Sequence, residues 1–448
     1  MKQGLWPLLG LFLLSACGQK SVENLDSTLS IQSNAYFVAF QDGGPEAPWQ
    51  VRVRDNSDYK PLSRGLSVDD ASRRFGLVFV CPSLAEEDAH QVFLYLGVTS
   101  EIRSLDHTCR KAEQDRSLQR IYGSVRGLAA NDGSNPGEMA VVALAPEVSL
   151  RAYEGYAAKA FLRRRDVLAF KGPLDPASNR ITPRRFYRRL NTDKTELVRA
   201  DIDFGDSGLT ADVTGKIPGQ VSIEGLQEGE SLRAVVGFIS QEGSFLPLTE
   251  ETDSAFSYWG VPRLRKSGEL FYDSEEGHQL RVTVRDAQGR DNRRLVVLFH
   301  QQQDITVTVP RLPPLQAGYT VSLRDAGQRR EVSAQVPGYY DTNYGAGILY
   351  RLDFQGQASS GGRPLQWTVY LTQQWLGSTP SLNLRLPSLT GLAGWDPAWE
   401  FKAATGVSSQ LSTYASRAKA GEVLEYLRSG GFRDGLAYAE ILQADDAP

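Results

Sequence analysis

The apolar segments of this chain are short, and this restricts the secondary structure that it can form. Beyond residue 17, apolar runs such as Phe75–Cys81 and Met139–Leu144 span only six or seven residues. Runs of this length, rich in β-branched and aromatic side chains and bounded by turn formers, are typical of strands. The 42 glycines and 22 prolines supply the turns between them. The pattern predicts an all-β protein.

The length of 448 residues exceeds what a single core supports, since cores stop growing near about 250–300 residues. A partial internal repeat indicates tandem modules. The run Ser124–Leu128 recurs as Ser222–Leu226, and each is followed by Ala-Val-Val. A second echo pairs Thr306–Leu312 with Asn383–Leu389. We therefore expect tandem Ig-like β-sandwich modules, with boundaries at 35–115, 116–208, 209–313 and 314–448.

The second module has a family resemblance. The spacing of Gly123, Val125 and Gly127 resembles the opening strand of carboxypeptidase regulatory-like domains, which are Ig-like β-sandwiches. The later runs Met139–Leu144 and Asp166–Phe170 fit the same resemblance, although Arg163-Arg164-Arg165 stand where the family usually has a glycine. The resemblance implies a β-sandwich over 116–208.

One C-terminal segment has a helical pattern. Within Ser416–Arg428, Val423, Leu424 and Tyr426 cluster on one side, and Gly430-Gly431 would end the helix. A β-hairpin through Gly421 and Gly430 is the alternative.

The N-terminal segment determines where we expect the protein to be found. Residues 1–17 combine a lysine, an apolar core and small residues before a break, which is typical of a secretory signal. The ending Leu14-Ser15-Ala16-Cys17 resembles the lipobox of bacterial lipoproteins, which implies cleavage before Cys17 and lipidation of that cysteine. Because Gly18 rather than aspartate follows, the resemblance favours the outer membrane. A plain signal peptide with a chance cysteine is the alternative, and the polar residues 18–34 are expected to be a flexible tether.

With Cys17 lipidated, two cysteines remain. In an oxidising envelope compartment Cys81 and Cys109 are expected to form a disulfide. A loop of this length would stabilise the first module by about 3–4 kcal/mol.

A catalytic site is suggested by one short motif. Gly205-Asp206-Ser207-Gly208 resembles the sequence around the nucleophile of chymotrypsin-like serine proteases, and His107 lies upstream as that family requires. Catalysis would need a histidine beside the serine, oriented by a carboxylate. Because Leu209 replaces the family's next glycine, and the two residues fall in different modules, a turn is the favoured interpretation.

Other chemistry has weaker signals. His90, His107, His278 and His300 show no metal-ligand spacing, and Asp201, Asp203 and Asp206 are favoured as solvent-facing carboxylates over calcium ligands. No metal or cofactor is therefore predicted. The net charge of −4 gives no indication of nucleic-acid binding. The basic stretches 163–165 and 184–189 are favoured as solvated edges over sites for anionic lipid or glycan.

Aromatic residues are dense toward the C-terminus, where they either fill a core or form a face for stacking on sugar rings: Trp367, Trp375, Trp395, Trp399, Tyr339, Tyr340 and Tyr344. Taken together, the sequence predicts a membrane-anchored envelope lipoprotein with a non-enzymatic structural or binding role. The expected partners are the membrane, through Cys17, and an envelope protein or glycan. A carbohydrate-binding surface protein and an envelope hydrolase with an unrecognised site remain alternatives.

Overall fold

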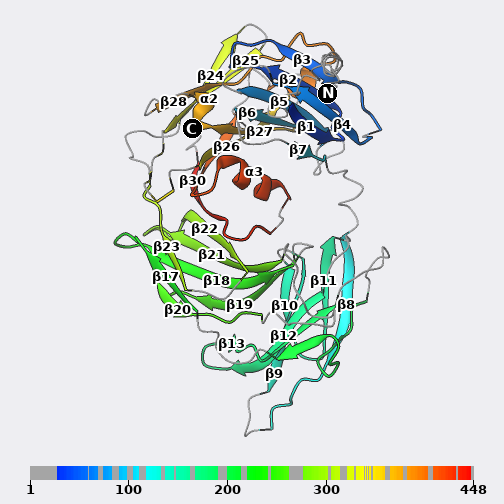
Figure 1. The fold of residues 1–448 in the computed structure, drawn as a ribbon, viewed down its shortest axis with the longest axis vertical. Coiled ribbons are helices and arrows are strands. Elements are labelled where there is room, and N and C mark those ends of the chain that lie inside the picture. Colours follow the sequence, from blue (N-terminus) through cyan, green and yellow to red (C-terminus); the bar gives the residue numbers. More distant parts are fainter. Residues whose placement is uncertain are drawn as a thin grey trace, which may run out of the picture.

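A computed structural model describes residues 28–444, except for the segments 59, 69–73, 83–89, 98–103, 110–117, 133–136, 146–147, 162–166, 190–198, 213–218, 241–243, 262–275, 301–303, 313–319, 327–328, 338, 340, 342, 345–346, 359–363, 377–380, 402–406 and 430–431. Within these residues the protein is all-β, as predicted (Figure 1). Its helices are short: α2 (Gln373–Leu376), the 3-10 helix η3 (Pro397–Trp399) and α3 (Ala420–Ser429).

The first three modules share one strand order, in which a three-stranded sheet faces a sheet built around four strands. In the first module the three-stranded sheet has the order β4 (Leu62–Ser67), β1 (Thr28–Ser33), β7 (Ser104–His107). The four-stranded part has the order β3 (Trp49–Val53), β2 (Phe37–Asp42), β5 (Phe75–Pro82), β6 (His90–Leu96). In the second module the three-stranded sheet has the order β11 (Gly155–Phe161), β8 (Leu118–Arg126), β15 (Ile202–Asp203). The larger sheet has the order β10 (Val148–Ala152), β9 (Glu138–Ala145), β12 (Val167–Asp175), β14 (Arg185–Arg189), β16 (Thr210–Asp212), and β13 (Arg180–Ile181) pairs with β12. In the third module the three-stranded sheet has the order β20 (Ala255–Ser257), β17 (Gln220–Glu224), β23 (Ile305–Thr308). The four-stranded part has the order β19 (Phe245–Glu251), β18 (Ser231–Ile239), β21 (Gly277–Arg285), β22 (Asp291–Phe299).

In each of these modules the first strand pairs in parallel with the strand that closes the three-stranded sheet. The first sequence echo lies on equivalent strands, because Ser124–Arg126 end β8 and Ser222–Glu224 end β17. Each strand is followed by a glycine with positive φ, 80° at Gly127 and 83° at Gly225, a conformation that favours glycine. The echo therefore marks a structural repeat. The second sequence echo, which lies on β23 and on β28 (Ser381–Arg385), does not mark a structural repeat. Strand β23 pairs in parallel with β17, whereas β28 pairs antiparallel with β25 (Arg329–Pro337).

The C-terminal module has two sheets, ordered β24 (Thr320–Ala326), β25, β28 and β27 (Pro364–Thr372), β26 (Gly347–Gln357), β29 (Ser408–Ser416), β30 (Ala437–Ala444). Its four-stranded sheet joins two others edge to edge. Strand β30 pairs antiparallel with β22, and β27 pairs in parallel with β6. The result is one twelve-stranded sheet through the first, third and C-terminal modules (Figure 1).

The segments 35–115 and 314–448, predicted as separate modules, therefore share a sheet and a core. Phe37 of β2 packs against Trp395 and Trp399, with ring centroids 5.6 Å and 5.4 Å apart. Helix α3 covers the opposite face of the sheet, where Val423 and Leu424 are fully buried. This confirms the predicted C-terminal helix and excludes the hairpin alternative over residues 420–429.

Two predicted boundaries need correction. Residues 28–33 were assigned to the flexible tether, but they form β1, in which Leu29 and Ile31 alternate inward and are buried. The polar composition masks this two-residue period. The boundary after residue 208 is also too early, because β16 pairs with β14 and completes a sheet of the second module. Residues 1–27, including Cys17, lie outside the described residues. In the part that is described, no helix is long and apolar enough to cross a membrane.

Candidate functional site

A cleft of about 610 Å³ opens where the second module meets the third. It lies between β10, the hairpin of β12 and β13, and the edge strand β19. These strands are in the lower half of Figure 1. Ligand sites in proteins commonly have this volume and commonly lie between domains. The cleft is therefore the candidate binding site.

The floor of the cleft is apolar because the central strands of the second module are apolar on both faces. Val142 and Ala169 point into that module's own core, whereas their neighbours Val141 and Phe170 point outward. The outward residues pack against buried side chains of the third module, including Leu248 of β19. This packing joins the two modules, and its margin forms the floor of the cleft.

A buried ion pair reinforces the same junction. Arg188 of β14 donates from both Nη atoms to the carboxylate of Glu276, at 2.7 Å and 2.5 Å. Both side chains are at most 5% exposed. Two modules held by apolar packing and a bidentate pair keep the walls of the cleft in fixed positions.

Trp259 provides an aromatic wall. It is half-buried against the module junction, and its backbone N–H donates to Thr249 Oγ1 at 2.8 Å. The adjacent Tyr258 is fully buried and anchors this part of the backbone. An indole held in this way presents part of its apolar surface to the cleft.

The rim carries planar polar groups in fixed orientations. Arg180 of β13 donates to both carboxylate oxygens of Glu251 at 2.7 Å, which ties the second module to the third across the cleft. Arg151 of β10 donates to the side chain and the backbone carbonyl of Asn179, at 2.7 Å and 2.8 Å. Asp175 accepts from Ser178 and from the backbone N–H of Ala177, and these hydrogen bonds lower the pKa of its carboxyl group.

The charged groups that line the cleft have partners within the protein. The described residues that line the cleft include no histidine, cysteine or lysine. Its glutamates are occupied, Glu251 by Arg180 and Glu250 by Arg233. What the cleft offers is an aromatic wall, an apolar floor and directed hydrogen-bonding groups.

The residues considered for serine-protease chemistry do not meet. Ser207 is exposed in a turn of the second module, where Asp206 Oδ1 accepts from the backbone N–H of Gly208 at 2.9 Å. His107 is buried in the first module, with Nδ1 2.8 Å from Tyr95 Oη and Nε2 3.3 Å from Cys81 Sγ. Both ring nitrogens already have neighbours, and the Gly-Asp-Ser-Gly stretch is a turn.

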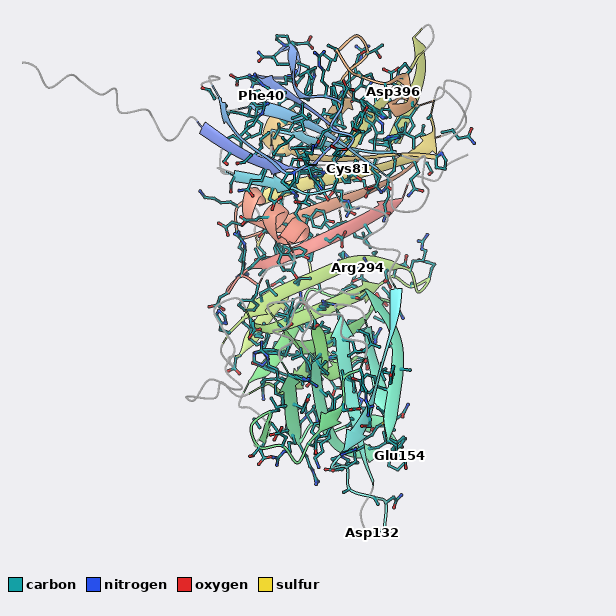
Figure 2. All side chains as sticks on the ribbon, turned by 90° about the vertical axis from the view of Figure 1, so that its right-hand side faces the viewer. Phe40, Cys81, Asp132, Glu154, Arg294 and Asp396 are labelled. Atoms are coloured by element: carbon teal, nitrogen blue, oxygen red, sulfur yellow. A yellow bond between two sulfur atoms is a disulfide. The ribbon has the colours of Figure 1, made fainter. Side chains whose placement is uncertain are left out.

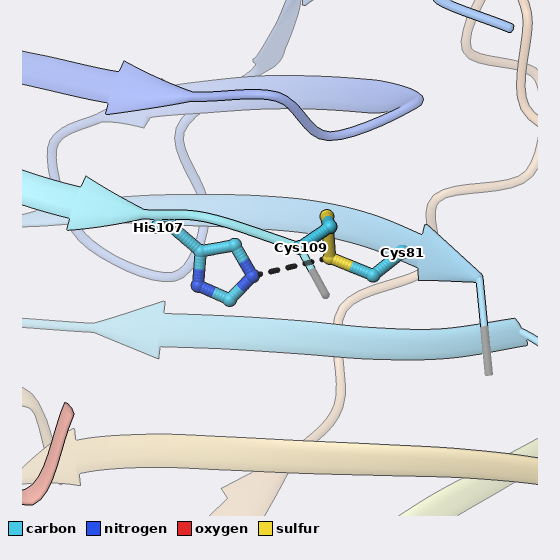
Figure 3. Close-up of side chains that lie close together, drawn as sticks. All are labelled: Cys81, His107 and Cys109. Carbon is cyan, nitrogen blue, oxygen red and sulfur yellow. Dashed lines mark hydrogen bonds between the residues drawn. A yellow bond between two sulfur atoms is a disulfide. The ribbon is translucent and has the colours of Figure 1, made fainter. Parts of the chain in front are cut away.

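The two remaining cysteines do meet. A disulfide joins Cys81, in the central strand β5, to Cys109, with Cα atoms 5.4 Å apart (Figure 3). The amide of Asn34 holds the backbone of Cys109, accepting from its N–H at 2.5 Å and donating to its carbonyl at 3.1 Å.

Several of the acidic and basic residues singled out in the sequence have structural partners. Asp201 accepts from Ser124 and Arg199, which lowers the pKa of its carboxyl group, and Asp203 accepts from the N–H of Gly205. In the basic stretch of β14, Arg188 is buried in its ion pair and Arg185 contacts Asp212. Residues 163–165 lie outside the described residues.

The C-terminal aromatic residues fill the core. Trp367, Trp375, Trp395 and Trp399 are each at most 8% exposed, as are Tyr339 and Tyr344, while Tyr340 lies outside the described residues. They form no exposed stacking face, so the observation behind that alternative is removed. The tryptophan that does line a cleft, Trp259, was not singled out, because its position beside β19 is a consequence of how two modules dock.

Fold and cleft together define a class, an all-β protein of tandem sandwiches with a cleft between the second and third modules. No protein-family model matches the chain, and no curated protein is detectably similar to it in sequence.

Proposed function

We propose that the protein is a lipid-anchored protein of the bacterial cell envelope that acts as a non-enzymatic binding module. The lipobox-like segment ending at Cys17 supports the anchor. The observation that carries the binding role is the cleft between β10, β13 and β19, which combines an apolar floor with oriented polar groups.

The arrangement of the modules supports this role. The described residues begin at β1 in the upper half of the molecule, whereas the strands β10, β13 and β19, which line the cleft, lie in the lower half (Figure 1). In Figure 2, Phe40 and Cys81 of the first module lie near one end, and Glu154 and Asp132 of the second lie near the other. An anchor that precedes β1 would leave the cleft directed away from the membrane.

We propose carbohydrate as the ligand class. The indole of Trp259 offers a surface on which the apolar face of a sugar ring can pack. Arg151, Arg180 and Asn179 are planar groups that can share hydrogen bonds with pairs of hydroxyls. Envelope glycans are abundant where a lipoprotein is found.

The anchor is tested by expressing the chain and its Cys17→Ala variant in a bacterial host and following incorporation of a labelled fatty acid. We expect the label in the unsubstituted chain, recovery in the membrane fraction, and loss of both in the variant. Equal labelling of the two chains would refute anchoring through Cys17.

The cleft is tested by titrating the purified protein with fragments of envelope polysaccharide and peptidoglycan, using calorimetry. The variant Trp259→Ala should weaken binding at least tenfold, as expected for loss of an aromatic contact. Tyr122→Ala is the matched control, because Tyr122 is 45% exposed on β8 and does not line the cleft. Equal affinity in both variants would place the ligand elsewhere.

A further inference from the structure

The disulfide of the first module has a histidine beside it. His107 is the last residue of β7 and Cys109 follows two positions later, so in extended backbone both side chains point to the same side. Cys81 comes from β5 and meets them there (Figure 3). His107 and the two cysteines each offer a ligand atom within 4.8 Å of the others, and all three residues are buried. No other group of three or more potential metal ligands is found among the described residues.

The packing around His107 holds its ring in one orientation. The ring stacks on Phe79, with centroids 4.4 Å apart and planes 19° from parallel, and contacts Phe93 at 4.7 Å. Tyr95 Oη lies 2.8 Å from Nδ1, which leaves Nε2 directed at Cys81 Sγ, 3.3 Å away. Histidines that bind a metal through Nε2 have such a second partner on Nδ1, which fixes the ring and the tautomer.

The tautomer that the ring can adopt in the reduced protein also suits a ligand. While the disulfide is intact, Cys81 Sγ can only accept, so Nε2 carries the hydrogen and Nδ1 accepts from the Tyr95 hydroxyl. After reduction the ring can take the other tautomer, in which Nδ1–H is donated to Tyr95 and Nε2 carries the lone pair.

We propose that reduction of the Cys81–Cys109 disulfide converts this cluster into a Zn²⁺ site, with the two Sγ atoms and His107 Nε2 as ligands. A dithiol supplies the two electrons and two protons, becoming a disulfide while Cys81 and Cys109 become thiols. Binding of Zn²⁺ then releases both thiol protons to solvent. A water completes the four-coordinate geometry, as in zinc sites with three protein ligands.

Charge balance favours a divalent ion such as Zn²⁺ over monovalent copper, both of which thiolates and imidazole bind. Two thiolates and one Zn²⁺ sum to zero, whereas a monovalent copper ion would leave a net negative charge. The surrounding cluster includes Phe79, Leu105 and Tyr95, and a net charge buried among such side chains is costly.

The position of β7 provides access. It is a strand of four residues at the edge of its sheet, and among the described strands its one partner is β1. Local opening of a segment can require less free energy than global unfolding. His107 and Cys109 would move with this strand, while Cys81 stays in the sheet.

The test uses the full-length chain carrying Cys17→Ser, so that Cys81 and Cys109 are its only cysteines. The protein is titrated with Co²⁺, a spectroscopic substitute for Zn²⁺, before and after treatment with a phosphine reductant. We expect one Co²⁺ per reduced chain, with thiolate-to-cobalt charge-transfer absorption that Zn²⁺ abolishes, and no such absorption from the oxidised chain. In His107→Phe, which keeps an aromatic ring against Phe79, the affinity should fall at least tenfold.

His300→Phe is the matched control, since that histidine lies outside the cluster, and it should bind as the parent does. Far-ultraviolet circular dichroism follows folding in each sample. The proposal is overturned if the reduced, folded chain gives no charge-transfer absorption, or if His107→Phe binds with parental affinity. It is also overturned if the reduced chain unfolds and Zn²⁺ does not restore its spectrum.

Discussion

Acid should destabilise the third module through one buried histidine. His278 of β21 is fully buried, and its ring stacks on Phe299 with centroids 5.4 Å apart. Its Nε2 accepts the backbone N–H of Val261 at 2.9 Å, which requires an unprotonated nitrogen. Burial lowers the pKa of His278 to about 4, an effect that a hydrogen bond with the backbone of His300 partly opposes.

The sign and size of the effect follow from proton linkage. Because the pKa is lower in the native state, the unfolded state binds more protons between about pH 4 and about pH 6.5, and stability increases with pH in that window. The contribution is fully present above pH 6.5 and is lost as the pH falls. At about 1.4 kcal/mol per unit of pH, roughly 2 kcal/mol is lost by pH 5 and roughly 3 kcal/mol by pH 4.

The assay is urea unfolding at about pH 7.5 and about pH 5, followed by tryptophan fluorescence. In His278→Gln the side-chain carbonyl can still accept from Val261, but the titration is removed. The loss of unfolding free energy between the two pH values should therefore be about 2 kcal/mol smaller than in the parent. His90→Gln, at a half-buried histidine of the first module, is the control. A pH dependence unchanged in His278→Gln would refute the argument.

Three further outcomes are expected. Arg188→Met should cost about 3–5 kcal/mol by leaving Glu276 buried without its partner, and adding Glu276→Leu should restore most of it, as measured by urea unfolding. Replacing Cys81 and Cys109 together by serine should cost about 3–4 kcal/mol because the loop between them spans 28 residues, and the same method detects it. Strand β30 joins the third module to the C-terminal module, because Ala439 pairs with both β22 and β29. Since proline cannot donate a hydrogen bond to a β-ladder, Ala439→Pro should weaken this junction and make it more sensitive to limited proteolysis.

Single strands could be predicted from the sequence where their whole pattern lies in adjacent residues. Every residue of Phe75–Cys81 is apolar and β5 is buried on both faces, so composition alone was sufficient. The disulfide was predictable because two cysteines allow one pairing. Strand β1 was missed because Leu29 and Ile31 are its only large apolar residues, and polar neighbours conceal their alternation.

Contacts between distant strands could not be predicted in this way. Strand β6 pairs with β27, and Gln91 donates to Gln366 across a separation of 275 residues. Both strands are apolar runs that would suit many neighbours, so nothing local specifies this one. The burial of the C-terminal tryptophans also depends on contacts between segments that are distant in the sequence. Trp399 lies in a 3-10 turn capped by Asp396 and its carbonyl accepts from Trp367, which only the assembled core determines.

The edge strand β19 bears on what the cleft can hold. The twelve-stranded sheet ends at β3 and β19, and exposed edges invite pairing with another extended chain. Strand β19 carries features that oppose this: Pro247 has no N–H to donate, the pairing with β18 shifts register between Val236 and Gly237, and Glu250 and Glu251 end the strand with charge. A peptide that binds by adding a strand would therefore pair poorly with β19. A ligand recognised through side chains is compatible with the same edge, which agrees with the carbohydrate ligand that we propose.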